Sequence, residues 1–155
     1  DAQKIITKLN HNLSEVSASN LFVTFTYLVY DCKTGLLTFV SGGHNPTLLL
    51  RSGSNEIECL TVAEGIPLGM MDSDFSKEET TLAKGDKIVL YTDGINEAWD
   101  VKGEEFGDKR LADIILANRE KDAEGIQKAI IEGVGNFTKG AAQHDDMTVI
   151  VIGIE

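Results

Sequence analysis

The sequence predicts an α+β fold in which helices pack outside antiparallel sheets. Before residue 93, short runs rich in β-branched and aromatic residues alternate with turn residues, which is typical of hairpins. Two amphipathic helical patterns then precede one last apolar strand, which must pair with a strand distant in the sequence. Antiparallel sheets with helices on their outer faces are the layered arrangement that buries these apolar surfaces.

The first part of the chain is expected to hold one helix and four strands. Residues 1–16 repeat apolar side chains at helical spacing, and the strand segments lie between glycine, asparagine, aspartate and serine turn residues. In chain order we expect a helix at 1–16, a loop at 17–20, strands at 21–30 and 36–41 around a turn at 31–35, a break at 42–46, and strands at 47–51 and 57–60 around a turn at 52–55.

The second part is expected to begin with an ordered irregular loop at 62–76 and a hairpin of strands 78–82 and 87–92. A loop at 93–107 is expected next, and Asp108 and Asp122 are expected to cap helices that end near Asn118 and Phe137. After a loop at 139–144, the last strand is expected at 147–154. Strand 87–92 and the last strand are apolar on both faces, so we expect both to be covered on both sides.

Two strand ends carry acidic residues that indicate a metal site. Asp93 and Gly94 follow one apolar strand, and Asp145 and Asp146 precede the last one. If these two strands are antiparallel neighbours, all three carboxylates reach the same edge of one sheet. Because Mg²⁺ and Mn²⁺ prefer oxygen ligands, the sequence predicts a site for such an ion at that edge.

Composition narrows the classes of function. The net charge of −11 argues against a nucleic-acid-binding protein and against docking on an anionic membrane. No apolar run approaches the about 20 residues that span a bilayer. Cys32 and Cys59 lie far apart, and we expect two free thiols in a cytoplasmic protein, with a disulfide as the alternative.

A series of short motifs follows one another along the chain. They are Leu21-Phe22-Val23-Thr24, Gly42-Gly43-His44-Asn45-Pro46, Gly65-Ile66-Pro67-Leu68-Gly69, Gly85-Asp86, Tyr91-Thr92-Asp93-Gly94, Glu97-Ala98, Phe106-Gly107 and Asp145-Asp146-Met147-Thr148. In this order they resemble the metal-dependent protein phosphatase family (type 2C). The nearest branch is the bacterial one of sporulation stage II and stress-response sigma-factor-regulating phosphatases.

The resemblance implies a single domain over residues 1–155, folded as a four-layer α-β-β-α sandwich. It also implies that the chain is the C-terminal roughly two-thirds of a complete domain. An earlier aspartate-glycine segment, whose aspartate bridges the two metal ions in the family, would lie before Asp1. We therefore expect the chain alone to be weak or inactive, and we expect a homodimer through an exposed sheet edge.

The resemblance also assigns roles to individual residues. Asp93 and Asp145 would be the catalytic residues and ligands of Mg²⁺ or Mn²⁺. Asp146 would bind metal directly or support the loop, because relatives often carry asparagine there. The residues expected beside these ligands are Gly94, Glu97, His44 and His144. The implied reaction is hydrolysis of a phosphoserine or phosphothreonine ester by metal-activated water.

The family context suggests an anti-sigma-factor antagonist or similar signalling phosphoprotein as substrate, and a sensor or receiver domain upstream. Several alternatives stay open at the level of sequence. His44 is a general acid or a hydrogen-bonding tie in its loop, and Glu97 holds an outer water or is a surface acid. His144 orients Asp145 or has no role, and Trp99 packs on its loop or meets a partner. The whole chain is an enzyme segment, a catalytically silent protein-binding module of the same fold, or an unrelated acidic sandwich.

Overall fold

The computed structural model describes residues 1–16, 21–62 and 65–155, which form two compact units. Unit 1 comprises Asp1–His44 and Thr61–Leu82, and unit 2 comprises Asn45–Leu60 and Ala83–Glu155. Each unit holds one antiparallel sheet and at least one helix, which confirms the predicted α+β class. The predicted loop at 17–20 and part of the loop at 62–76 lie outside the described residues. The assignment of residues 1–155 to one domain stays a prediction.

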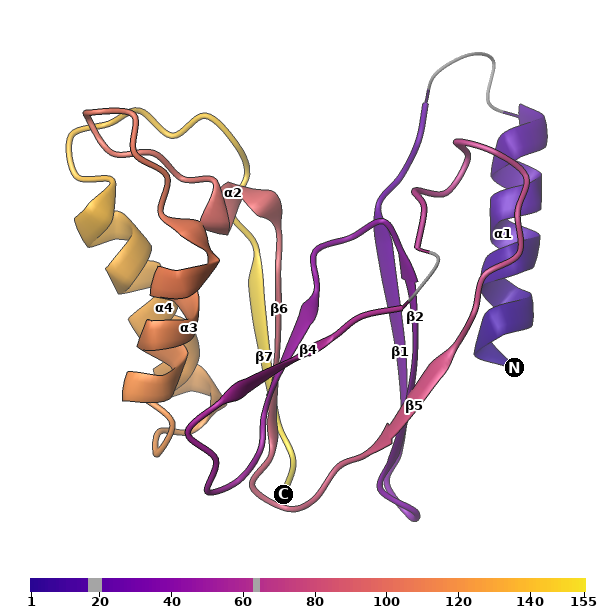
Figure 1. The fold of residues 1–155 in the computed structure, drawn as a ribbon, viewed down its shortest axis with the longest axis horizontal. Coiled ribbons are helices and arrows are strands. Elements are labelled where there is room, and N and C mark those ends of the chain that lie inside the picture. The colour runs from indigo at the N-terminus through magenta and orange to yellow at the C-terminus, as the bar shows by residue number, and fades with distance from the viewer. Residues whose placement is uncertain (17–20, 63–64) are drawn as a thin grey trace. The chain divides into compact units, whose positions relative to one another are not determined.

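Unit 1 is a three-stranded sheet with one helix beside it. Its elements are α1 (Ala2–Val16), β1 (Phe25–Asp31), β2 (Leu36–Gly42) and β5 (Glu78–Thr81), with the strands in the order β1-β2-β5. The helix α1 lies against β2, as Figure 1 shows. The buried residues that hold helix and sheet together are Ala2, Ile6, Val40, Leu68 and Phe75. The amphipathic pattern of residues 1–16 therefore correctly predicted a helix that packs its apolar face on a sheet.

The β1–β2 hairpin closes as expected. The Asp31 carboxylate accepts the backbone N–H of Lys33 at 2.8 Å, and the Gly35 N–H donates to the Asp31 carbonyl at 2.8 Å. Gly35 has a φ of 72°, a conformation that glycine adopts without steric cost. The strand before the turn begins later than predicted, at Phe25, and within Leu21–Thr24 the structure has an isolated bridge between Val23 and Leu68.

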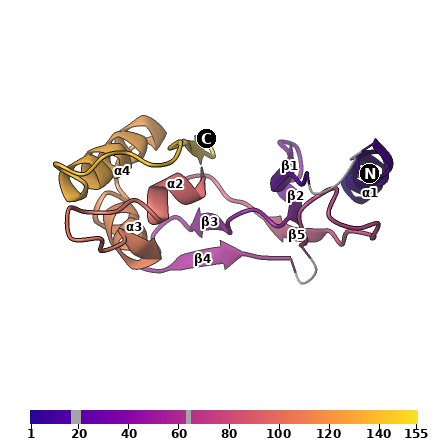
Figure 2. The ribbon, with the colours of Figure 1, turned by 90° about the horizontal axis from the view of Figure 1, so that it is seen from above.

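Unit 2 is a four-stranded sheet covered by two helices. Its elements are β3 (Thr47–Leu50), β4 (Ile57–Leu60), β6 (Lys87–Tyr91), α2 (Asp93–Asn96), α3 (Gly107–Ala117), α4 (Ala123–Phe137) and β7 (Val149–Gly153). The strand order is β4-β3-β6-β7, and α3 and α4 pack together on one face of the sheet (Figures 1 and 2). Leu111, Ile115, Ile126 and Ile130 are fully buried in this core. As predicted, the Asp122 carboxylate caps α4 by accepting the Gly125 N–H at 2.8 Å.

The pairing of β6 with β7 is the feature that places the site. The two strands are antiparallel neighbours, with Lys87 opposite Gly153 and Tyr91 opposite Val149. The end of β6 therefore lies beside the beginning of β7. This confirms the pairing on which the predicted convergence of the acidic strand ends depends.

Three predictions for elements after residue 77 are wrong. Strands 78–82 and 87–92 form no hairpin, because β5 pairs with β2 whereas β6 pairs with β3 and β7. Asp93 does not begin a loop but the one-turn helix α2. Asp108 caps nothing, because α3 begins at Gly107 and the Asp108 carboxylate instead accepts the Tyr91 hydroxyl at 3.1 Å. Burial and, to a smaller extent, this carboxylate raise the pKa of the Tyr91 phenol, so that it donates as a neutral group.

The last strand is less covered than its sequence predicts. Val149 is 7% exposed, but Ile150 and Ile152 on the opposite face are 50% and 40% exposed. The strand β7 also ends the order β4-β3-β6-β7 among the described strands. An edge strand with exposed isoleucines is a surface that can pair with another chain. The expected homodimer through a sheet edge stays a prediction.

Two further expectations concern the whole chain. Both cysteines are exposed and free, which confirms the prediction of free thiols over a disulfide. In the part of the chain that the structure describes, no helix has the length and apolar character needed to cross a membrane.

A buried carboxylate, Asp86, ties the turn before β6 to the turn after β3. It accepts the backbone N–H groups of Ser52 at 2.8 Å and Ala83 at 3.0 Å, and a third bond from the Arg51 guanidinium at 3.2 Å. Burial by itself raises the pKa of Asp86, but the three donors outweigh it and hold the pKa below its ordinary value. The charged carboxylate is therefore the form that the fold stabilises.

We expect Asp86→Asn to destabilise the protein by about 1–3 kcal/mol, because an amide nitrogen cannot accept the bonds that the lost oxygen accepted. Folding lowers the pKa of Asp86, so the charge stabilises the fold above the unfolded-state value of 3.8, and this stability is lost as the pH falls through the folded value. Urea unfolding of both proteins over about pH 3–7 measures the difference. Equal acid sensitivity in the two proteins would contradict the expectation.

Candidate functional site

The pairing of β6 with β7 continues past both strand ends through Thr92. The Thr92 N–H donates to the Thr148 carbonyl at 3.1 Å, and the Thr148 N–H donates to Thr92 Oγ1 at 3.0 Å. The same hydroxyl donates to the Asp146 carbonyl at 3.1 Å. Thr92 thus bonds to Asp146 and to Thr148, the two residues that flank Met147. These three bonds fix the chain before Asp93 against the chain after Asp145.

Gly94 brings these two segments into direct contact. A Cβ atom at Gly94 would lie 2.3 Å from the Asp146 carbonyl oxygen and 2.9 Å from its carbonyl carbon. Real side chains do not approach a backbone so closely, so only glycine fits at this position. In the motif Thr92-Asp93-Gly94, Thr92 therefore bonds to the segment before β7 and Gly94 contacts it closely. Asp93 lies between these two residues.

Asp93 is the first residue of α2, and its carboxylate is exposed. Its Oδ1 accepts the N–H of Gly94 at 3.0 Å, and its carbonyl accepts the N–H of Glu97 at 2.8 Å. The helix is anchored beneath by Ile95, which is fully buried. Asp93 Oδ2 makes no hydrogen bond to a described residue. This oxygen is available to a ligand from solvent.

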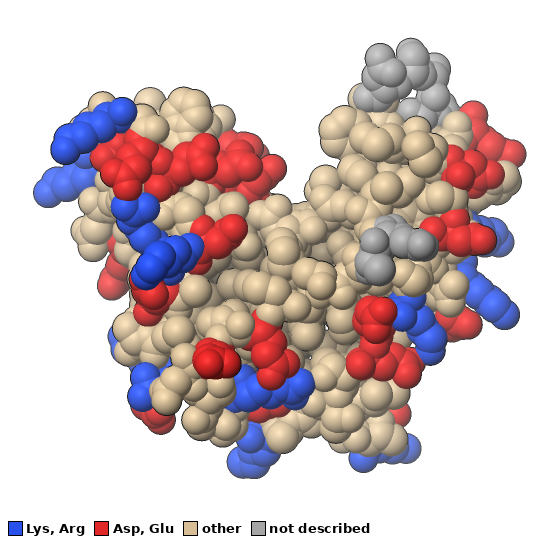
Figure 3. Space-filling model, in the orientation of Figure 1, with Lys and Arg blue, Asp and Glu red and all other residues tan. Residues whose placement is uncertain are grey.

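Asp145 and Asp146 lie in the loop that leads into β7, and both are exposed. Asp145 Oδ1 accepts the N–H of Asp146 at 2.7 Å, and the Gln143 side-chain amide donates to the Asp145 carbonyl at 2.7 Å. The backbone around Asp145 is therefore held by its neighbours while part of the carboxylate stays open. Acidic side chains gather over the end of unit 2 that carries α2 (Figure 3).

The donor set fits a hard divalent cation. Asp93, Asp145 and Asp146 offer only carboxylate oxygens, the ligands that Mg²⁺ and Mn²⁺ prefer. They lie on two segments in contact through Gly94. Within residues 1–16, 21–62 and 65–155, however, no group of three or more histidine, cysteine, aspartate or glutamate residues is arranged to hold an ion. The role of these three carboxylates as metal ligands stays a prediction.

The structure places the other predicted site residues in different surroundings. Glu97 ends the turn of α2 and is exposed. His144 precedes Asp145, and its ring packs against Trp99 in a tilted arrangement with centroids 4.8 Å apart. His44 belongs to unit 1, where its Nδ1 lies 3.2 Å from Thr24 Oγ1. That bond supports a hydrogen-bonding tie in the loop. The roles of these residues stay predictions.

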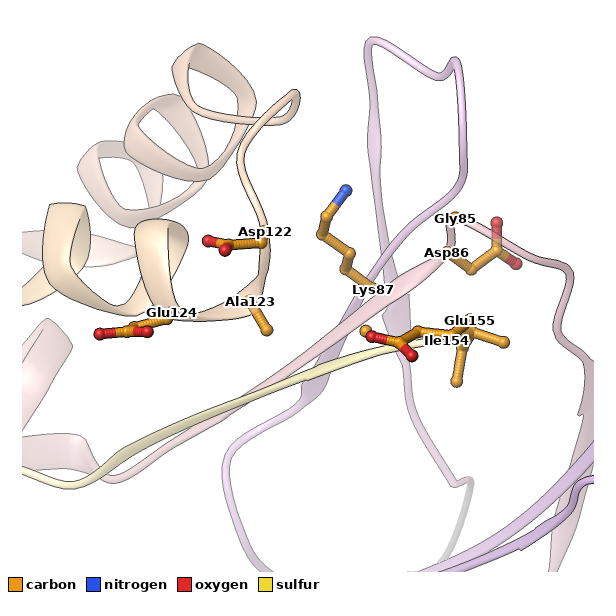
Figure 4. Close-up of a pocket in the computed structure, with 9 residues that line it drawn as sticks. Gly85, Asp86, Lys87, Asp122, Ala123, Glu124, Ile154 and Glu155 are labelled. Carbon is orange, nitrogen blue, oxygen red and sulfur yellow. The ribbon is translucent and has the colours of Figure 1, made fainter.

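A cavity of about 360 Å³ lies elsewhere in unit 2, and it is a poor candidate for the site. Figure 4 shows the carboxylates of Asp122 and Glu124 turned away from that of Glu155, so the three do not converge on one point. Asp122 already caps α4, and the Glu124 carboxylate pairs with Lys128 at 2.5 Å. The cavity borders Lys87 and Gly153, at the opposite end of the β6–β7 pair from Asp93.

Sequence reasoning missed two residues near this site, Thr92 and Asn96, and left open what Trp99 contacts. Thr92 is part of the recognised motif, but no role was predicted for its hydroxyl, which bonds to Asp146 and Thr148. Asn96 on α2 receives a hydrogen bond from the Asn45 side chain at 3.3 Å. The contact of Trp99 with His144 joins two loops that are distant in sequence. A polar residue directly before Asp-Gly at a strand end was the one available signal.

Comparison with known proteins reveals relatives along the whole chain. Protein IcfG of Synechocystis sp. is 30% identical over 133 residues, which cover 85% of this chain and 20% of IcfG. Phosphoserine phosphatase RsbU of Bacillus subtilis is 28% identical over 151 residues, which cover 96% of this chain and 44% of RsbU. The chain thus spans less than half the length of either relative.

Solved structures share the fold. The PP2C phosphatase domain of SpoIIE from Bacillus subtilis, solved with a fragment of its regulatory domain, superposes with a TM-score of 0.82 at 24% identity. The match covers 99% of this chain and 44% of that one. The catalytic domain of the serine/threonine protein phosphatase PstP, in complex with two manganese ions, gives a TM-score of 0.69 at 16% identity, over 97% of this chain and 70% of that one.

The family model described as stage II sporulation protein E (SpoIIE) matches residues 1–155. The match therefore extends over all the motifs quoted above, from Leu21 to Thr148. It confirms the resemblance that those motifs indicated. The chain belongs to the stage II sporulation protein E (SpoIIE) family, whose fold is that of the type 2C phosphatases.

Proposed function

We propose that this chain is part of a Mg²⁺- or Mn²⁺-dependent protein phosphatase that hydrolyses phosphoserine or phosphothreonine esters. The observation that carries the proposal is the contact of Gly94 with the Asp146 backbone. This contact and the Thr92 hydrogen bonds hold the segments of Asp93 and Asp145 together at one end of the β6–β7 pair. Membership of the family and the phosphatase activity named for RsbU support the same function.

Asp93 and Asp145 would hold the metal, with Asp146 as a further ligand or as a support for the loop. A bound pair of such ions supplies a water of lowered pKa and neutralises charge on the phosphoryl oxygens. The chain's own contribution is positioning. Thr92 fixes the two segments in register, Gly94 permits their close approach, and α2 presents the Asp93 carboxylate from a buried base. The manganese ions bound to PstP support this choice of metal.

The substrate we propose is a phosphorylated signalling protein, such as an anti-sigma-factor antagonist. The name of RsbU as a phosphoserine phosphatase supports the phosphorylated residue, and the regulatory domain solved with SpoIIE supports a sensor or receiver domain in the longer protein. We further propose a cytoplasmic location, where such regulators act.

A second candidate is a catalytically silent protein-binding module of the same fold. The observation that favours it is the lack, among the described residues, of three ligands gathered in one place. A chain that supplies only two or three exposed carboxylates can keep the fold and lose the reaction. The two candidates differ in whether the longer protein turns over a phosphate ester.

The test is Mn²⁺-dependent hydrolysis of p-nitrophenyl phosphate by residues 1–155 and by a protein extended upstream by about seventy residues. We expect activity in the extended protein and little or none in residues 1–155, because the shorter chain offers an incomplete ligand set. Silence in both proteins, together with no shift of melting temperature on adding Mn²⁺, would reject the enzyme in favour of the binding module.

A further inference from the structure

The segment between α2 and α3 is a hydrogen-bonded hairpin that carries Trp99. The Asp100 N–H donates to the Glu104 carbonyl at 3.0 Å, and the Phe106 N–H donates to the Ala98 carbonyl at 2.8 Å. At the tip, the Asp100 carboxylate accepts the N–H of Glu104 at 2.9 Å. Trp99 itself forms a bridge with Glu105, opposite it in the hairpin.

The base of this hairpin is part of the core of unit 2. Ala98 and Phe106 are 1% and 2% exposed. The Phe106 ring meets the Phe137 ring edge to face, with centroids 5.4 Å apart. The Arg110 guanidinium lies over the same Phe137 ring at 4.7 Å, and it also pairs with Glu104 of the hairpin. The position of Trp99 is therefore set by buried packing below it.

The hairpin supports the acidic loop, residues 139–146, at two places. The Trp99 and His144 rings lie 4.8 Å apart at an interplanar angle of 40°. A Cβ atom at Gly140 would lie 3.3 Å from Val101 Cγ1, so the Val101 side chain rests directly on the backbone of that glycine. Trp99 remains 48% exposed, which means that its packing on His144 is a surface contact rather than a core requirement.

Asp145 lies between a hydrogen bond on one side and an aromatic contact on the other. On its C-terminal side, Thr92 binds the carbonyl of Asp146. On its N-terminal side, the ring of the neighbouring His144 packs against the Trp99 ring. The Asp145 side chain is exposed and its own bonds go to residues of the same loop. Among the described contacts, Trp99 is the aromatic support of the loop before Asp145, beside the Val101 contact and the hydrogen bond from the Ala141 N–H to the Thr138 carbonyl at 2.8 Å.

We propose that Trp99 is a positioning residue, which acts through His144 to hold Asp145 beside Asp93. The inference rests on the proposed metal site and adds a residue that makes no contact with Asp93 or Asp145 in the described hydrogen bonds. The loop is ordered before a metal arrives, so less conformational entropy is lost when the metal binds. The flat aromatic surface is the property that matters, and phenylalanine should retain most of it.

The experiment compares Mn²⁺ dissociation constants, measured from the electron paramagnetic resonance of free Mn²⁺. The proteins are the full-length protein that contains this chain and its Trp99→Ala, Trp99→Phe, Ile131→Ala and Asp93→Asn variants. Ile131 is a matched control, because it is a large apolar residue that is 46% exposed on α4. Hydrogen exchange of peptides covering 139–148, without metal, reports the order of the loop directly.

We expect Trp99→Ala to weaken Mn²⁺ binding about three- to tenfold, the range of one aromatic contact. Exchange in 139–148 should accelerate with no change in melting temperature. Trp99→Phe should restore most of the affinity, Ile131→Ala should change neither quantity, and Asp93→Asn should abolish binding. An unchanged dissociation constant in Trp99→Ala would overturn the positioning role, whether or not exchange changes. Intact binding in Asp93→Asn, or none in the wild type, would instead overturn the metal site on which the role rests.

Discussion

Replacing Asp93 by asparagine is expected to remove Mn²⁺-dependent phosphatase activity from the extended protein, by more than about 100-fold. The physical reason is the donor set. Loss of an outer partner of a metal ligand already costs about 10–100-fold, and a ligand itself should cost more. Asparagine keeps the size of the side chain and can still accept the Gly94 N–H, so the backbone of α2 should be unchanged. The measurement is the rate of p-nitrophenyl phosphate hydrolysis as a function of Mn²⁺ concentration.

The matched control is Asp113→Asn on α3. Asp113 is exposed and pairs with Lys109 at 2.6 Å, away from β7 and its acidic loop. The same chemical change there should leave the rate unaltered and the melting temperature nearly so, because an exposed helical ion pair contributes only about 0.3–0.5 kcal/mol. Equal loss of activity in both variants would mean that net charge, and not a ligand at Asp93, controls the reaction.

Gly94→Ala should be damaging although it adds only one methyl group. The new Cβ would lie 2.3 Å from the Asp146 carbonyl oxygen, and neither backbone can move without breaking the Thr92 hydrogen bonds. We expect a loss of about 1–3 kcal/mol of stability, as for other overpacked sites. Because the segments of Asp93 and Asp145 are forced apart, we also expect activity to fall about 100-fold, the effect of a displacement near 1 Å. Urea unfolding and the hydrolysis assay measure the two effects.

Gly135→Ala is the matched control, and we expect it to stabilise the protein. Gly135 is in α4 and is exposed, and a Cβ atom there would have no neighbour within 4 Å. Alanine is the better helix former by about 0.8–1.0 kcal/mol, so this variant should be more stable and fully active. If Gly94→Ala behaved like Gly135→Ala, the close contact between α2 and the acidic loop would not exist in solution.

Much of the candidate site could be predicted from the sequence, because its acidic residues lie at strand ends. An apolar strand followed by Asp93 and a second one preceded by Asp145 predict one acidic edge, provided that the strands pair. The register of Tyr91 with Val149 meets that condition. The order of the motifs predicted the family. The amphipathic patterns of residues in α1 and α4 predicted these helices, because periodicity is a local property of the sequence.

Local signals failed where a distant partner decided the outcome. The segment 78–82 reads as one arm of a hairpin with 87–92, but its backbone bonds go to Leu36–Phe39 of β2. Asp108 has the right position for a cap, but the Tyr91 hydroxyl takes its carboxylate. Ile150 and Ile152 are as apolar as core residues and are nevertheless exposed, because they lie on the face of β7 opposite Val149, which packs in the core with α3 and α4. Propensity and pattern are weak when tertiary contacts compete with them.

The sequence by itself determined the family of this protein, its fold class and the two carboxylates at the strand ends, because each depends on the order and spacing of residues along the chain. Only the tertiary structure decided how the site is assembled. The hydrogen bond from Thr92 to Asp146, the close backbone contact at Gly94 and the packing of Trp99 against His144 all join segments distant in sequence. Such contacts form when packing brings two surfaces together, and no local pattern of residues specifies which surfaces these are.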